Sequence, residues 1–254
     1  LLQRTTPDRS DSPDLNRSFP GSNRWIAEQL AQAITTELLS QTDAMIDFHS
    51  GAWGRVLADV SYGIDSPNPA VVEQSKELAK AFGYPSIRRG KMRTVFPGPR
   101  SSVAYTASVL EKPAISVEIV GAGFSKEFEE RMIANSIAGI ENVMKHLGML
   151  DGQMVLPERY LVWEKRLRVY PATAGHIFPT IEAEDLILQE VKENQLLAVV
   201  RSPYTFETVD ELRSPCDGVI FIACRHQPVR PGDFSFSVID TADAQSQWLT
   251  PDEF

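Results

Sequence analysis

An aspartate and a histidine lie two residues apart at the end of a short apolar run, in the stretch AMIDFHSG at residues 44–51. We expect this run to form a buried strand that delivers Asp47 and His49 to its carboxyl end, just before a flexible Ser-Gly pair. Ligands of open α/β sheets bind at the carboxyl ends of strands, and imidazole is the commonest metal ligand in proteins. His49 is therefore a candidate metal ligand. A histidine that is simply hydrogen-bonded at a strand end fits these eight residues equally well.

A glutamate interrupts a second apolar run, AISVEIV at residues 114–120, which is followed by Gly-Ala-Gly. On a strand with such neighbours Glu118 would be half-buried, and a buried carboxylate is costly unless it is paired or functional. Burial raises the proton affinity of a carboxylate, so that it can serve as a general base toward water. The alternative is a glutamate bonded to a neighbouring backbone group or arginine; we favour the general base.

Asn16 and Arg17 are adjacent in a polar, proline-rich stretch that precedes an expected helix. The planar guanidinium of Arg17 can hold a carboxylate by two hydrogen bonds, and the amide of Asn16 adds a neutral donor. The pair suits the acidic end of a small substrate. Considered alone, an ion pair between Arg17 and a nearby surface aspartate is the more common arrangement.

The elements that must position these residues alternate between strands and helices over the first 150 positions. Apolar periodicity and capping residues predict helices at residues 23–40, 69–82, 101–110 and 125–146, with strands before His49, at 55–60 and at 114–120. This alternation predicts an α/β fold, with a sheet flanked by helices. The apolar residues expected on the inner faces of the first and last helices are Ile26, Leu30, Ile34, Leu38, Phe128, Met132, Ile133, Ile137, Ile140, Val143 and Met144.

The character of the sequence changes at residues 151–157. Beyond them we expect short strands separated by Pro, Gly and Asp, a spacing typical of a small all-β barrel or sandwich. The chain is therefore predicted to hold a catalytic domain at 1–150 and a β-rich domain at 151–254. The strands expected in the second domain cover residues 167–170, 176–179, 196–201, 218–223 and 234–238.

Composition restricts the partners and the compartment. The 254 residues carry a formal net charge of −9, which argues against nucleic acid or an anionic membrane as the main partner. The sequence has only two cysteines, so a disulfide framework is not expected and a reducing cytoplasm is the default. No apolar run approaches the roughly 20 residues that span a bilayer. The abrupt opening LLQRTTPDRS, without Met or a first strand, leads us to expect that the amino-terminal part of the protein is absent.

Three motifs together resemble the succinylglutamate desuccinylase/aspartoacylase family. They are DLNRSFPG at residues 14–21, DFHSG at 47–51 and ISVEIVGAG at 115–123, in this order and spacing. The resemblance implies a zinc-carboxypeptidase-like fold, with a mixed sheet flanked by helices, and one Zn²⁺ per chain. It also implies hydrolysis of the amide bond of a small N-acyl amino acid or related compound.

The resemblance assigns roles to individual residues. His49 matches the family's third zinc ligand, and Glu118 matches the glutamate that activates the zinc-bound water. Asn16 and Arg17 match the pair that grips the substrate carboxylate. For a further arginine that contacts substrate upstream of this pair we choose Arg4, with Arg9 as the alternative in sequence.

Two nearby residues receive weaker assignments. Tyr105 lies near a position where some members carry a functional tyrosine. Asp47 is a candidate to orient His49, although an aspartate that caps backbone at the strand end is an equal alternative.

The family's first two zinc ligands form an H-x-x-E pair upstream of DLNR, and no histidine in this sequence has Glu at the third following position. A catalytic zinc needs three protein ligands. We therefore expect the two further ligands upstream of this sequence. The alternative is a metal-free relative that acts as a binding or assembly protein; a peptidase is a third interpretation, and homo-oligomer formation is left open.

The carboxy-terminal part resembles the barrel-sandwich module of biotinyl and lipoyl domains, over residues 214–219 and 229–233. It lacks the lysine turn of those carriers, so a carrier role is not expected. We expect a packing domain rather than a cover for the active-site mouth or an assembly module.

Overall fold

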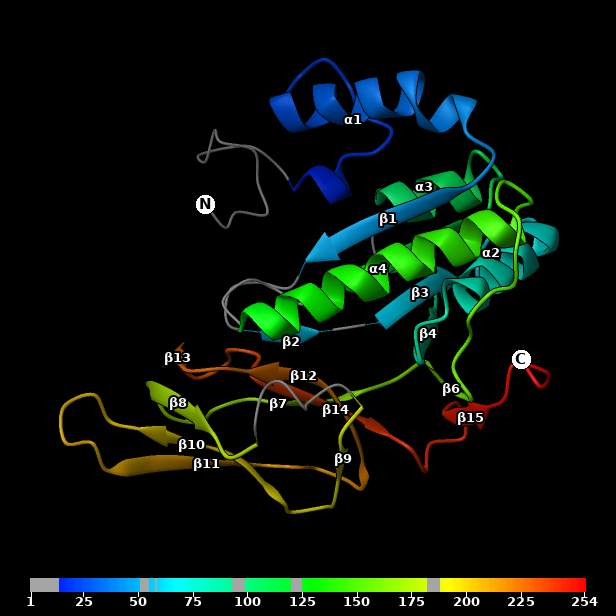
Figure 1. Ribbon diagram of the computed structural model, residues 1–254. Coiled ribbons are helices and arrows are strands. Elements are labelled where there is room, and N and C mark those ends of the chain that lie inside the picture. Colours follow the sequence, from blue (N-terminus) through cyan, green and yellow to red (C-terminus); the bar gives the residue numbers. More distant parts are fainter. Residues whose placement is uncertain (1–13, 51–54, 58, 93–98, 120–124, 182–187) are drawn as a thin grey trace. The chain divides into compact units, whose positions relative to one another are not determined.

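The computed structural model describes residues 14–50, 55–57, 59–92, 99–119, 125–181 and 188–254, and Figure 1 shows its helices and strands. Arg4 and Arg9 lie outside the described residues. The chain divides into two compact units, each assembled from separate segments, so the predicted domain boundary near residue 150 stays a prediction. The first unit holds Leu1–Phe48, Val60–Val117 and Gly139–Leu156, and the second holds His49–Asp59, Glu118–Ala138 and Pro157–Phe254.

The first unit is an α/β structure. Its strands follow the order β1-β5-β3-β4 in the sheet, and β3 and β4 pair in parallel. The strands are β1 (Met45–Ser50), β3 (Asp59–Gly63), β4 (Ser86–Gly90) and β5 (Ala114–Ile119). The helices are α1 (Ile26–Glu37), α2 (Pro69–Phe82), α3 (Ser102–Ser108) and the end of α4 (Lys126–His146), with short 3₁₀ turns η1 (Leu15–Arg17) and η2 (Leu39–Gln41).

Helix α2 shows how local sequence signals set the ends of an element. The Asn68 side chain accepts a hydrogen bond from the backbone N–H of Ala70, and Pro69 occupies the first turn. Both are preferred helix starts. Gly83 ends the helix with φ = 78°, a left-handed conformation that glycine adopts without a Cβ penalty. The helix predicted over residues 69–82 is confirmed.

Helices lie on both faces of strand β1. Successive side chains of a strand point to opposite faces, so neighbouring residues of β1 contact different helices. Asp47 points toward α3, where its Oδ2 is hydrogen-bonded by the Ser102 hydroxyl. Phe48 points the other way, and its ring centroid lies 6.1 Å from that of Phe82 in α2. The prediction of a sheet flanked by helices is therefore confirmed.

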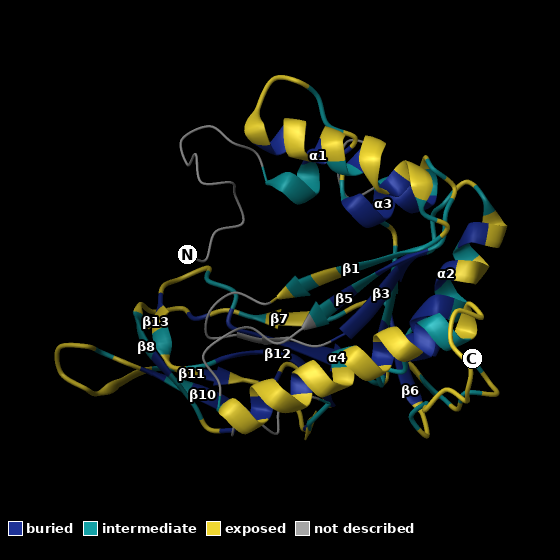
Figure 2. Cartoon of the chain, turned by 45° about the horizontal axis from the view of Figure 1, so that its top comes forward, coloured by how far each residue is buried: buried dark blue, intermediate teal, exposed yellow. Residues whose placement is uncertain are grey.

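Two helices bury different faces from those expected. Helix α1 turns Ala27, Ala31 and Thr35 inward, whereas Ile26, Leu30 and Leu38 are exposed. Small side chains allow close approach, and Ala31 packs with Phe19 and Leu39. In α4, Phe128, Met132 and Val143 are buried as expected, but Ile133, Ile137 and Ile140 are exposed. Figure 2 shows the long exposed face of this helix. Apolar periodicity identified both helices but not the side that meets the core.

The second unit contains antiparallel sheets. One has the order β11-β10-β8-β13, another runs β2-β12-β14-β7 with β9 paired to β12, and β6 pairs with β15. The strands are β2 (Arg55–Leu57), β6 (Tyr160–Trp163), β7 (Leu167–Val169), β8 (Gly175–Pro179), β9 (Glu190–Val191), β10 (Leu196–Arg201), β11 (Thr208–Arg213), β12 (Gly218–Cys224), β13 (Gln227–Val229), β14 (Phe236–Asp240) and β15 (Gln247–Leu249).

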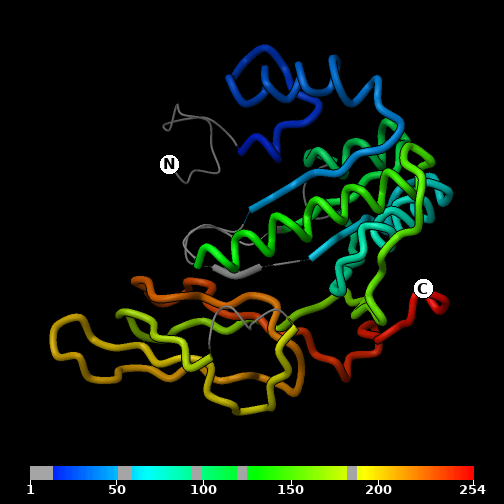
Figure 3. The backbone as a smooth tube through the Cα atoms, viewed as in Figure 1, coloured from blue at the N-terminus to red at the C-terminus, as the bar shows by residue number. Residues whose placement is uncertain are grey.

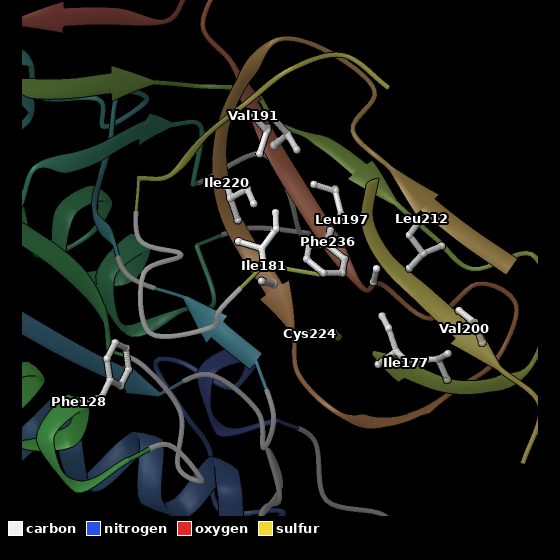
Figure 4. Close-up of a cluster of buried hydrophobic side chains, with 14 of the residues drawn as sticks. Phe128, Ile177, Ile181, Val191, Leu197, Val200, Leu212, Ile220, Cys224 and Phe236 are labelled. Atoms are coloured by element: carbon white, nitrogen blue, oxygen red, sulfur yellow. The ribbon is translucent and has the colours of Figure 1, made fainter. Parts of the chain in front are cut away.

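Side chains from two of these sheets form one core. Ile177 and Leu197 come from the first sheet, Ile220 and Phe236 from the second, and all are at most 2% exposed. Figure 4 shows them pointing toward one another between the strands. This is the packing of a sandwich, so the predicted β-rich carboxy-terminal part is confirmed as a sandwich. Among the described residues, no helix is long and apolar enough to cross a membrane.

Candidate active site

The DLNRSFPG segment is held in place mainly by its own hydrogen bonds. The Asp14 side chain accepts from the backbone N–H of Asn16 at 2.9 Å, and the Ser18 hydroxyl donates to the carbonyl of Asp14 at 2.9 Å. Farther along, Phe19 is buried and its N–H donates to the carbonyl of Arg100 at 3.1 Å. These bonds fix the backbone on either side of Asn16 and Arg17, which gives the pair a defined position.

A buried carboxylate of α1 binds the residues that directly follow this segment. Figure 3 traces the backbone from the segment into α1. Glu28 is 8% exposed and accepts hydrogen bonds from the Ser22 hydroxyl and from Arg24, whose Nη2 lies 2.8 Å from Oε1. The bond from Ser22 has the largest effect in lowering the pKa of Glu28, helped by Arg24 and by the charge of Arg100. Glu28 is therefore ionised at neutral pH, as this arrangement requires.

Gly21 ends the segment where no side chain fits. Its φ is +98°, and a Cβ there would overlap the backbone N of Gln32 and the carbonyl of Glu28 in α1. We expect Gly21→Ala to lower the free energy of unfolding by about 3 kcal/mol or more, because strain and overlap add. Urea unfolding of the variant measures this loss.

The matched control for this prediction is Gly148→Ala. Gly148 also has a positive φ, +70°, but among the described residues no atom beyond its two chain neighbours lies within 4 Å of the point that a Cβ would occupy. This variant should cost only about 1 kcal/mol. Equal losses in the two alanine variants would contradict the close approach at Gly21.

A serine joins Asn16 to strand β1. The backbone N–H of Ser102 donates to Asn16 Oδ1 at 2.9 Å, and its hydroxyl is hydrogen-bonded to Asp47 Oδ2. The partially buried Arg17 donates from Nη1 to the carbonyl of Asn16 at 2.5 Å. The structure thus brings Asn16 and Asp47 together through a residue that the sequence analysis did not single out.

His49 and Glu118 occupy matching positions on neighbouring strands. The backbone N–H of Met45, the first residue of β1, donates to the carbonyl of Pro113, the residue just before β5, at 3.0 Å. In a parallel pair this bond sets Met45 opposite Ala114, the first residue of β5. The two strands are adjacent and run in the same direction (Figure 2). His49 and Glu118 lie four residues beyond Met45 and Ala114, respectively. Regular pairing along the two strands therefore sets them opposite each other, at the spacing of about 5 Å between neighbouring strands.

Both side chains are half-buried. Residues in register on neighbouring strands point to the same face of the sheet, so the imidazole and the carboxylate share a side. A carboxylate and an imidazole side by side at the carboxyl ends of strands can hold a metal ion, a water molecule, or both. Such an arrangement is compatible with general-base hydrolysis.

The described residues do not complete a metal site by themselves. Nowhere in the part of the chain that the structure describes do three or more His, Cys, Asp or Glu side chains gather closely enough to hold an ion. His146 lies in α4, and His176 packs beside Phe178 in the sandwich. The described residues therefore fit one imidazole ligand of a zinc ion, and the other ligands would have to come from outside them.

The remaining predicted residues have these positions. Tyr105 is half-buried in α3 and packs against a cluster that includes Phe19. Asp47 accepts a hydrogen bond from the Ser102 hydroxyl, and its predicted role in orienting His49 stays a prediction. Ser102 was missed because consecutive serines before a run of small residues indicate only a helix start, and Ser101 is indeed that cap.

The fold and these residues define an α/β protein with a carboxy-terminal sandwich and polar groups at the ends of adjacent sheet strands. Residues 3–147 match the succinylglutamate desuccinylase/aspartoacylase catalytic domain, and the chain belongs to this family. The resemblance drawn from the three motifs is confirmed.

A curated relative and two solved structures are similar to this chain. N-α-acetyl-L-2,4-diaminobutyric acid deacetylase of Halomonas elongata is 29% identical over 160 residues, which cover 61% of this chain but only 43% of that protein. Product-bound ectoine utilization protein EutE (DoeB) from Ruegeria pomeroyi is 24% identical with a TM-score of 0.75, covering 94% of this chain and 70% of the other. A succinylglutamate desuccinylase from Silicibacter sp. TM1040 is 21% identical with a TM-score of 0.75, covering 93% and 70%. The structural likenesses support the fold.

Proposed function

We propose that this protein is a zinc-dependent deacylase that cleaves the amide bond of a small N-acyl amino acid. The observation that carries the proposal is the pairing of His49 with Glu118 at the carboxyl ends of β1 and β5. Family membership and the deacetylase relative support it. The relative's substrate class, an acetylated diamino acid, gives the first compound to test.

Glu118 is the proposed general base. It takes a proton from the attacking water as the oxygen–carbon bond forms at the acyl carbonyl, and it passes that proton to the amine as the carbon–nitrogen bond breaks. The products are a free carboxylic acid and an amino acid.

Asn16 and Arg17 are the proposed grip on the substrate carboxylate. The guanidinium supplies a charged two-point contact, and the Asn16 amide supplies a neutral donor. A fixed carboxylate holds the substrate in the site in the ground state and the transition state alike. Arg4, outside the described residues, is proposed to contact the substrate or the developing oxyanion.

His49 is the proposed protein ligand for Zn²⁺ within the described residues, with one ion per chain and further ligands outside them. When bound, zinc lowers the pKa of water at the site and polarises the acyl carbonyl. We also propose a cytoplasmic location, because Cys216 and Cys224 do not form a disulfide bond with each other. Burial raises the pKa of Cys216 to about 11, with the nearby carboxylates of Asp240 and Asp217 adding to the effect, so that thiol stays protonated and unreactive at neutral pH.

Amine release by the full-length protein tests the proposed function. The panel comprises N-α-acetyl-L-2,4-diaminobutyrate, N-succinyl-L-glutamate and N-acetyl-L-aspartate, with dipeptides of matched size as controls. We expect at least one N-acyl amino acid to be hydrolysed and the dipeptides to be poor substrates. Preferential cleavage of the dipeptides would favour a peptidase instead.

A non-catalytic binding or assembly protein is the second candidate. The observation that favours it is the lack of a three-ligand metal cluster in the described part of the chain. Such a protein would bind an N-acyl amino acid without releasing the amine. Calorimetric binding without turnover on the same panel would support this candidate over the hydrolase.

A further inference from the structure

Ser102 touches two of the motifs at once, although they are far apart in the sequence. It stands at the start of α3 and is 8% exposed. Its contacts reach Asn16, 86 residues away, and Asp47, 55 residues away. The hydroxyl oxygen of Ser102 also lies 3.2 Å from Asn16 Oδ1. This one residue therefore links the proposed carboxylate grip to strand β1, through its backbone N–H to Asn16 and its hydroxyl to Asp47.

The hydrogen-bond chemistry determines the orientation of the Asn16 amide. A backbone N–H can only donate, so the atom 2.9 Å from the Ser102 nitrogen must be the amide oxygen. The Ser102 hydroxyl has a single proton to give, and the carboxylate of Asp47 is a stronger acceptor than an amide oxygen. The hydroxyl thus anchors Ser102 to Asp47, while the Ser102 N–H holds Asn16 Oδ1. Because the amide is planar, Nδ2 of Asn16 is directed away from Ser102.

We infer that Ser102 is a positioning residue that holds Asn16 with its Nδ2 donor turned toward the substrate carboxylate, and that Asp47 anchors Ser102. This inference rests on the proposed function, since it assigns the donor to that substrate. Ser102 itself touches no reacting atom. It acts through Asn16, so its removal weakens a contact that is made equally in the ground state and the transition state. Such a loss raises KM and leaves kcat nearly unchanged.

Three variants of the full-length protein test the inference in steady-state assays with the N-acyl amino acid that is turned over. Ser102→Ala should raise KM about 5-fold, the factor expected for one ordinary hydrogen bond, with kcat within about 2-fold. Ser102→Thr keeps the hydroxyl and should restore KM. The matched control is Ser101→Ala, which removes the neighbouring hydroxyl that accepts from Ala104 N–H at 3.1 Å and should leave KM unchanged.

A double variant separates positioning from a general loss of structure. If Ser102 acts through Asn16, adding Ser102→Ala to Asn16→Ala should produce no further rise in KM. A KM of the double variant that rises by the product of the two single-variant factors would overturn the inference. An unchanged KM in Ser102→Ala, or an equal rise in Ser101→Ala, would overturn it as well while leaving the proposed function intact.

A measurement that needs no turnover keeps the two proposals distinguishable. The side-chain amide of Asn16, observed by NMR in uniformly ¹⁵N-labelled protein, should have a lower order parameter in Ser102→Ala than in the wild type or in Ser101→Ala, because a less firmly anchored amide moves over a wider range. If the wild type hydrolyses no member of the panel, the proposed function fails. The NMR measurement then still tests whether Ser102 positions Asn16. Equal order parameters of the Asn16 amide in all three proteins would contradict the positioning role.

Discussion

Glu118→Gln is expected to lower kcat by about 10²–10⁴-fold, the range that a positioned general base contributes. Glutamine has nearly the same shape as glutamate but cannot take a proton from water. The side chain is half-buried on β5, and the neutral amide removes a charge from that setting, so the fold should tolerate the change. Zinc content and thermal stability should match those of the wild type, and the loss should appear in kcat rather than in KM.

Glu73→Gln is the matched control for this variant. Glu73 is an exposed glutamate of α2 whose contact is an ion pair with Lys76 at 3.0 Å, and exposed pairs of this kind contribute little. Its turnover should equal that of the wild type. Full turnover by Glu118→Gln would remove Glu118 from its proposed role, whatever the metal content.

His49→Ala is expected to reduce both bound zinc and turnover by more than about 100-fold. Even partners outside the ligand shell cost 10–100-fold in metal affinity or activity when they are removed, so loss of a ligand should cost more. The neighbours of His49 in β1, Phe48 and Ser50, are already solvent-accessible, so the variant should stay folded. Metal analysis of the purified variant, alongside its kcat, measures both effects.

The control is His226→Ala. His226 is exposed in the sandwich, where its ring packs edge-on against Phe178 with centroids 5.3 Å apart. This variant should retain the zinc and the turnover of the wild type. Zinc retained in His49→Ala would show that the imidazole at the end of β1 is not a ligand.

Elements with strong local signals could be predicted from the sequence. The strand that carries Asp47 and His49, the strand that carries Glu118 and the helix α2 all appear where apolar runs and caps indicated them. Strand β11 was missed because only one of its side chains, Leu212, is buried. Its polar sequence gives no alternating apolar pattern, and its place in the sheet is set by pairing with β10.

The inner faces of helices could not be predicted in the same way. Helix α1 offers a row of large apolar residues and an adjacent row of small ones, and the small row is buried. Periodicity detects that a helix is amphipathic, but the choice between adjacent rows depends on the shape of the surface it meets. In α1 that surface includes the ring of Phe19 and the side chain of Leu39.

The same limit applies to the candidate site. The motifs identified Asn16, His49 and Glu118 as individual candidates, because each motif is local in sequence. The link through Ser102 depends on a contact across 86 residues, which no local pattern encodes. The register of β1 against β5, which sets His49 opposite Glu118, likewise depends on tertiary pairing.

The zinc content of the full-length, catalytically assayed protein is the most direct test of the account. We expect about one ion per chain, amine release from an N-acyl amino acid, loss of that activity on chelation, and its recovery when zinc is restored. A well-folded protein that contains no zinc and hydrolyses the substrate at an undiminished rate would contradict the account.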